Sequence, residues 1–139
     1  MISIRETDLY NEVLKEFNYS FGNVFVFEGF VVSEMNRGVV VSWENAKLII
    51  DDVVSSLNTR GEDLIYITNR INSYSVVAAD WLKFFKQSYS LKAYCIVSDN
   101  KMSSLNLMIE KLFFQNKIKH FSNLYAAINF VKKGLAEVA

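Results

Sequence analysis

Three short apolar runs in the second half of the chain constrain the fold more than any other feature. They read LIYIT at residues 64–68, AYCIV at residues 93–97 and IKHF at residues 118–121. Near-continuous apolar runs of strand length are typical of parallel strands that are covered on both faces. A segment long enough for a helix separates each run from the next. This alternation predicts parallel strands joined by right-handed helical crossovers, which is the pattern of an α/β sheet.

The segments around these runs carry apolar residues at helical spacing. The clearest one precedes the first run, where Ser42 is a good N-cap and Gly61 is expected to end the helix. Its apolar stripe consists of Trp43, Ala46, Ile50, Val53, Val54 and Leu57. Further helices are predicted at about residues 78–88, around residues 102–113, and from a cap at Ser122 to about residue 135.

The first third of the chain has a different pattern. Residues 13–19 alternate in polarity as an edge strand does, and residues 24–27 and 30–35 are β-branched and aromatic runs around Glu28 and Gly29. The two runs predict a hairpin or one long bent strand, and residues 1–12 predict an irregular or helical arm. The expected architecture is one α/β domain over residues 1–139, with a mixed sheet in which N-terminal antiparallel strands precede helix–strand repeats, in the order βββαβαβαβα.

Charge and hydropathy argue against two classes of partner. Fifteen basic and fifteen acidic residues cancel, so no overall field attracts the chain to nucleic acid. The longest apolar run, residues 21–32, is interrupted by Asn23 and Glu28 and falls short of the roughly 18 residues that a membrane span needs. The N-terminus is too polar for a signal peptide, and we therefore expect a cytoplasmic protein without a transmembrane segment.

The residues for common enzyme chemistry are scarce. The single cysteine, Cys95, lies inside an apolar run and is expected to be a buried small hydrophobe. The single histidine, His120, is expected to be structural or on the surface, which disfavours a nucleophilic site, and the two residues together cannot complete a zinc site. No glycine-rich phosphate loop is present. We expect no catalytic residues, no metal and no cofactor.

Polar residues follow the first two apolar runs, and parallel strands would bring them to one edge, where ligands and partners of α/β sheets bind. Arg70 is of most interest, because a guanidinium can hold a carboxylate or phosphate through two parallel hydrogen bonds. In the alternative interpretation, Asn69 and Asn72 shape the turn and Arg70 pairs with a nearby acid. The candidate binding residues are Asn69, Arg70, Asn72, Ser73, Tyr74, Ser75, Ser98 and Asn100.

Four stretches resemble the STAS-like domains, the fold of anti-sigma-factor antagonists and of related small bacterial proteins. They are SFGNVFVFEGFVVSEMNRGVVVSWENAK, YITNRINSYSVVAADWLKFFK, YCIVSDNK and KIKHFSNLYAAINFVKKG. In the resembled antagonists, a serine in an Asp-Ser-Ser/Thr-Gly motif between this strand and this helix is phosphorylated and controls binding. Here the aspartate and glycine are missing, but the resemblance implies Ser73 and Ser75 as phosphorylation sites.

These observations lead to a ranked set of functions. The first is a non-enzymatic regulatory domain of the STAS-like type that docks a protein partner through residues 69–75. The alternative is a small-molecule or lipid carrier, which would require an apolar cavity. An enzyme is third, because it would need Tyr74, Arg70 and Asp80 to converge. A homodimer would use a self-association patch that includes Trp81, Leu107, Met108 and Phe114.

Overall fold

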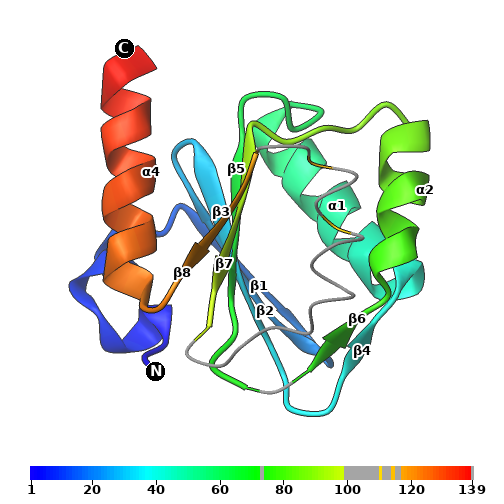
Figure 1. Cartoon of the computed structure of the whole chain (residues 1–139), viewed down its shortest axis with the longest axis horizontal. Coiled ribbons are helices and arrows are strands. Elements are labelled where there is room, and N and C mark those ends of the chain that lie inside the picture. Colours follow the sequence, from blue (N-terminus) through cyan, green and yellow to red (C-terminus); the bar gives the residue numbers. More distant parts are fainter. Residues whose placement is uncertain (73, 99–109, 111–113, 115–116, 139) are drawn as a thin grey trace.

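A six-stranded mixed sheet runs through the centre of the computed structural model, which describes residues 1–72, 74–98, 110, 114 and 117–138 (Figure 1). The strand order is β1-β2-β3-β5-β7-β8; β1 to β3 are antiparallel, and β3, β5, β7 and β8 are parallel. The predicted α/β class and mixed sheet are confirmed. The strands are β1 (Lys15–Tyr19), β2 (Gly22–Phe27), β3 (Phe30–Met35), β5 (Ile65–Asn69), β7 (Ala93–Val97) and β8 (Ile118–Phe121).

Helices cover both faces of the sheet (Figure 1). On one face lie α1 (Trp43–Leu57) and α2 (Trp81–Lys86). On the other lie α4 (Leu124–Val138) and the N-terminal 3-10 helices η1 (Ile4–Glu6) and η2 (Asp8–Glu12), so the predicted N-terminal arm is helical. Coverage of both faces explains why the two central parallel strands, β5 and β7, are mostly apolar and buried.

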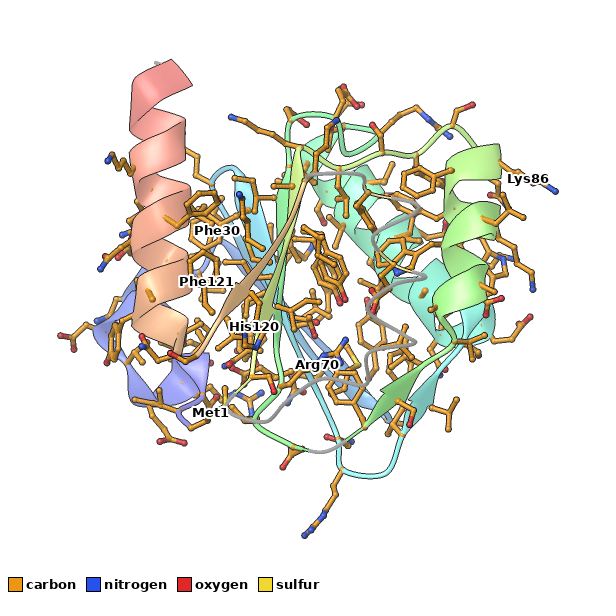
Figure 2. The ribbon with its side chains drawn as sticks, in the orientation of Figure 1. Met1, Phe30, Arg70, Lys86, His120 and Phe121 are labelled. Carbon is orange, nitrogen blue, oxygen red and sulfur yellow. The ribbon has the colours of Figure 1, made fainter. Side chains whose placement is uncertain are left out.

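Successive side chains on each strand point to opposite faces and supply two separate cores. On β5, Ile65 and Ile67 pack in the core beneath α4, whereas Tyr66 packs among aromatic rings on the face of α1 and α2. Phe30 and Phe121 lie toward α4 in Figure 2, together with the buried apolar residues of that helix. The α1 side is filled mainly by Val24, Val26, Val31, Met35, Val53 and Leu64.

The predicted hairpin of β2 and β3 is confirmed. Its two strands pair from Gly22 with Met35 to Phe27 with Phe30. The connection needs Gly29, whose φ of 84° lies in the region that favours glycine. The rings of Phe27 and Phe30 stack with centroids 4.5 Å apart on the α4 side of the hairpin.

Helix boundaries differ from the predictions in three places. Helix α1 begins after Ser42, as predicted, and a capping box there includes Asn45. The helix ends at Leu57 with Asn58 as its C-cap, whose φ is 51°, so Gly61 does not end it. The predicted helix 78–88 is a 3-10 turn, η3 (Ala78–Asp80), followed by the short α2. The side chain that accepts the backbone N–H of Ala126 in the first turn of α4 belongs to Asn123, at 2.9 Å, and not to Ser122.

The sequence did not predict the second, two-stranded sheet. Its parallel strands are β4 (Val40–Val41) and β6 (Ser75–Val76), and β6 lies in the polar segment that follows the first apolar run. Two-residue strands have no detectable period, which is why pattern analysis misses them. The helix predicted around residues 102–113 lies outside the described residues except for position 110.

Candidate functional site

The carboxyl ends of the parallel strands lie side by side, as expected. The backbone N–H of Arg70 donates to the carbonyl oxygen of Val97 at 2.9 Å, and the N–H of Ser98 donates to that of Phe121 at 3.0 Å. The residues after β5 and β7 therefore share one edge of the sheet. Two of the candidate residues, Ser73 and Asn100, lie outside the described part of the chain.

Asn69 faces the α4 side and holds the N-terminal segment in place. It is fully buried, and its Nδ2 donates to the Glu34 carboxylate at 2.8 Å and to the carbonyl oxygen of Ile2 at 3.0 Å. The same carboxylate accepts the hydroxyl of Ser3 at 2.6 Å and the backbone N–H of Ile4 at 2.8 Å. Asn69 thus belongs to a buried polar network that fastens η1 to β3 and β5.

The next candidate residues shape the turn after β5. The side chain of Asn72 donates to the carbonyl oxygen of Met35 at 3.2 Å, and the backbone N–H of Ser75 donates to that of Val39 at 2.9 Å. Asn72 and Ser75 are exposed, whereas Ser98 is buried. The alternative interpretation, in which Asn69 and Asn72 have structural roles, agrees with these contacts.

Arg70 lies on the opposite face, the side of α1 and α2, at the lower end of the sheet in Figure 2. Its guanidinium lies over the ring of Tyr74, 5.2 Å from the centroid. Its Nη2 is 3.9 Å from Oε1 of Glu110, a carboxylate that is 1% exposed and whose Oε2 accepts the indole N–H of Trp81 at 3.0 Å. The Arg70–Glu110 pair agrees with the alternative in which Arg70 is neutralised by an acid within the protein.

Tyrosine hydroxyls surround this ion pair. The Tyr94 hydroxyl interacts with both Arg70 and Glu110, the Tyr66 hydroxyl bonds to Ser33 at 2.6 Å, and the Tyr74 hydroxyl bonds to that of Thr68. We call Arg70, Glu110, Tyr66, Tyr74 and Tyr94 the Arg70 cluster. Burial raises the pKa of each of the three tyrosines, so their hydroxyls stay neutral donors. Burial also raises the pKa of Glu110, while the charge of Arg70 acts in the opposite direction.

A mostly apolar cavity of about 130 Å³ adjoins the Arg70 cluster. It lies between α1, α2 and the sheet, and it extends along β5 from Gly61 and Leu64 at the amino end to Thr68 and Tyr74 at the carboxyl end. Residues of both helices and of strands β3, β4, β5, β6 and β7 form its walls, among them Ala46, Ile50, Trp81, Phe84, Val31 and Tyr94.

Some residues of this cavity could be singled out from the sequence, but the cavity itself could not. Ile50 was predicted on the apolar stripe of the helix after Ser42, whereas Trp81 was assigned to the self-association patch. Such a stripe looks the same whether the facing side chains fill the space between two layers or leave part of it open. The signal that could have directed attention here is the density of aromatic residues in residues 64–85.

Other predicted features are located as follows. Cys95 is completely buried, as predicted, and burial raises the pKa of its thiol to about 11. His120 is exposed on β8. Phe114, assigned to the self-association patch, is 3% exposed and packs against Trp81 with ring centroids 4.7 Å apart. Within the described ranges, no group of three or more His, Cys, Asp or Glu side chains is arranged to hold a metal ion.

Comparisons of the chain with protein-family models, with curated proteins and with solved structures find no match. Among the helices that the structure describes, none has the length and hydropathy required to cross a membrane. The cavity and the Arg70 cluster are therefore the features from which a function can be inferred.

Proposed function

We propose that this protein binds a small, mostly apolar molecule in the cavity between α1, α2 and the sheet. The observation that carries the proposal is the cavity itself, with a volume of about 130 Å³. An apolar cavity of about 150 Å³ engineered into another protein binds benzene. The space is therefore adequate for a benzene ring or a short alkyl chain.

The distribution of polar groups also supports ligand binding. Small-molecule sites typically combine apolar walls with a few polar groups that fix the orientation of the ligand. Here the walls are aliphatic and aromatic, and the hydroxyls of Thr68 and Tyr74 lie at the carboxyl end of β5, the end at which α/β sheets bind their ligands. The site would thus accept a molecule whose one polar end points toward these hydroxyls.

Isothermal titration calorimetry with hexan-1-ol as a probe tests the proposal. The wild-type protein is expected to bind it saturably, and Ala46→Trp, which places an indole in the cavity, should weaken binding at least tenfold. Ala79→Trp is the matched control, because Ala79 is exposed and does not line the cavity. Val54→Phe fills the same space if Ala46→Trp does not fold. Absence of saturable binding to the wild type, or equal binding by Ala46→Trp, would contradict the proposal.

The second candidate is the docking function that the STAS-like resemblance implies, with residues 69–75 as the contact surface. The exposure of Asn72 and Ser75 after the carboxyl end of β5 supports it, since both side chains are accessible to a partner or a kinase. A phosphate on Ser75 would add up to two negative charges to this edge. In the STAS-like arrangement, that change would switch the affinity for the partner.

Mass spectrometry of the protein purified from its native cells tests this candidate. Phosphorylation of Ser73 or Ser75 under at least one growth condition is the expected result. If both serines are unmodified in every condition, the phosphorylation switch is wrong.

A further inference from the structure

We infer that the ligand of the cavity is an uncharged molecule that contains an aromatic ring. This inference depends on the proposed function, because it names the chemical class of the molecule that the cavity takes. It starts from the rings that line the cavity on the side of the sheet and α2. We call these residues the aromatic wall: Tyr66, Trp81, Phe84, Tyr89 and Tyr94.

The rings of the aromatic wall form one continuous group. Trp81 lies at its centre, with ring centroids 5.3 Å from those of both Phe84 and Tyr94. Tyr66 and Tyr89 extend the group, at 6.4 Å from Trp81 and 5.6 Å from Phe84 respectively. Aromatic pairs at such separations attract one another beyond the effect of apolar burial. A ligand ring against this wall would gain the same attraction, whereas an aliphatic ligand would not.

The parts of the wall that a ligand can contact are mainly ring carbons. Tyr66, Trp81 and Tyr89 are only partly buried, and all three line the cavity. The indole N–H of Trp81 donates to Glu110 at 3.0 Å, and the hydroxyl of Tyr66 bonds to that of Ser33 at 2.6 Å. Because these polar atoms already have partners within the protein, the wall favours contact with an apolar ring.

The wall on the side of α1 is mainly aliphatic. Ala46, Ile50, Val53 and Val54 line the cavity there. One face of a flat ligand would therefore meet the aromatic wall and the other would meet aliphatic carbon atoms. Neither contact requires a charge on the ligand.

The charged side chains that line the cavity among the described residues are also engaged. Asp80 accepts the backbone N–H of Trp43 at 2.7 Å through Oδ2, and its Oδ1 is 3.4 Å from Nζ of Lys83. Arg60 donates to two backbone carbonyl oxygens. A charged ligand would lose its hydration in the cavity without gaining a free partner of opposite charge, which is unfavourable.

The test compares benzyl alcohol with cyclohexylmethanol by calorimetry at pH 7. The two probes have the same number of carbon atoms and the same hydroxyl, and the saturated ring is the more hydrophobic, so apolar burial alone would favour cyclohexylmethanol. The wild type is expected to bind benzyl alcohol at least fivefold more tightly than cyclohexylmethanol. Benzoate and benzylamine, which are charged at pH 7, should bind at least tenfold more weakly than benzyl alcohol. Tighter binding of either charged probe than of benzyl alcohol would show that the ligand is not uncharged.

Trp81→Leu removes the central ring of the aromatic wall and should bring the two affinities within twofold of each other. The ratio of the affinities is the readout, because the larger cavity changes both. Phe85→Leu is the matched control, since Phe85 is a partly buried ring of α2 that does not line the cavity, and it should keep the fivefold preference. If Trp81→Leu does not fold, Phe84→Leu replaces it and should lower the preference at least twofold. A preference that persists without the wall residue, or that is lost in Phe85→Leu, would overturn the inference.

Tryptophan emission gives an independent readout. The two tryptophans of the chain, Trp43 and Trp81, both line the cavity, so benzyl alcohol should change their fluorescence saturably, with the midpoint found by calorimetry. Binding without any change in emission would place the ligand elsewhere, and the inference would be wrong. If cyclohexylmethanol and hexan-1-ol bind at least as tightly as benzyl alcohol, the inference fails while the cavity function stands; if no probe binds, both fail.

Discussion

At the scale of single residues, two glycines of this chain have opposite structural roles. Gly61 has a φ of 103°, and a Cβ atom built on it would overlap the carbonyl oxygen of Ser90, so both its conformation and its surroundings exclude a side chain. Gly134 lies inside α4, and a Cβ atom there would meet no neighbouring atom. The sequence pattern places Gly61 at a helix end, but its actual role is this close approach to the loop before β7.

The substitution of each glycine by alanine should therefore change stability with opposite sign. Gly61→Ala is expected to lower the free energy of unfolding by at least about 2 kcal/mol, through strain and overlap with Ser90. Gly134→Ala should raise it by up to about 1 kcal/mol, because alanine is the better helix former. Urea unfolding followed by circular dichroism measures both changes. Equal effects of the two substitutions would contradict the assigned role of Gly61.

At the scale of elements, the N-terminal segment is bound to the sheet by more than apolar contact. Ile4 is fully buried beneath α4, and the Glu34 carboxylate collects hydrogen bonds from Ser3, from the backbone of Ile4 and from Asn69. The carboxylate of Glu34 thus joins η1, β3 and β5. The position of residues 1–12 could not be predicted from the sequence, because a helical turn of three residues is too short for its apolar pattern to show which side faces a core.

Replacement of Glu34 should loosen this segment. Glu34→Gln turns one acceptor oxygen into a donor that faces other donors, and the expected loss in the free energy of unfolding is about 1–3 kcal/mol. Trypsin cleavage after Arg5 should also become faster than in the wild type. Glu62→Gln is the control, because Glu62 is exposed. An unchanged unfolding midpoint and cleavage rate would show that the Glu34 network does not hold the N-terminal segment.

At the scale of the whole molecule, the mixed sheet follows from the sequence and the site does not. Three apolar runs and one hairpin signal were sufficient for the α/β class, because strand-length periodicity is a local property of the chain. Asn69 and Arg70 lie on opposite faces of the sheet because of the register of β5. A shift of this register by one residue would exchange the faces to which the two side chains point. The cavity depends on the distance between two helices and the sheet, which no local pattern encodes.

The interior of the molecule also determines how the protein responds to alkaline pH. Burial raises the pKa of Cys95 from 9.0 to about 11, so the unfolded chain releases this proton at a lower pH than the folded protein. The corresponding stabilisation is complete below pH 9 and is lost as the pH rises toward 11. Tyr66 and Tyr94 act in the same direction, because burial raises the pKa of both.

The free energy of unfolding should therefore fall between pH 8 and pH 10.5, by about 2 kcal/mol from Cys95 alone. Urea unfolding at the two pH values measures the loss. Cys95→Ala, which removes the thiol, should show a smaller loss over the same interval. If the wild type and Cys95→Ala lose the same amount, ionisation of this thiol does not contribute.

Because side chains alternate along β5, two neighbouring residues of this strand form a matched pair for locating a bound ligand. Ile67 contributes only to the layer beneath α4, whereas its neighbour Thr68 lines the cavity on the other side. Conservative replacements at these two adjacent residues change side chains on opposite faces of the sheet, so each one affects only one of the two layers of the interior. A ligand whose affinity changes in Thr68→Val but not in Ile67→Val therefore binds on the side of α1 and α2, and this can be concluded without a structure of the complex.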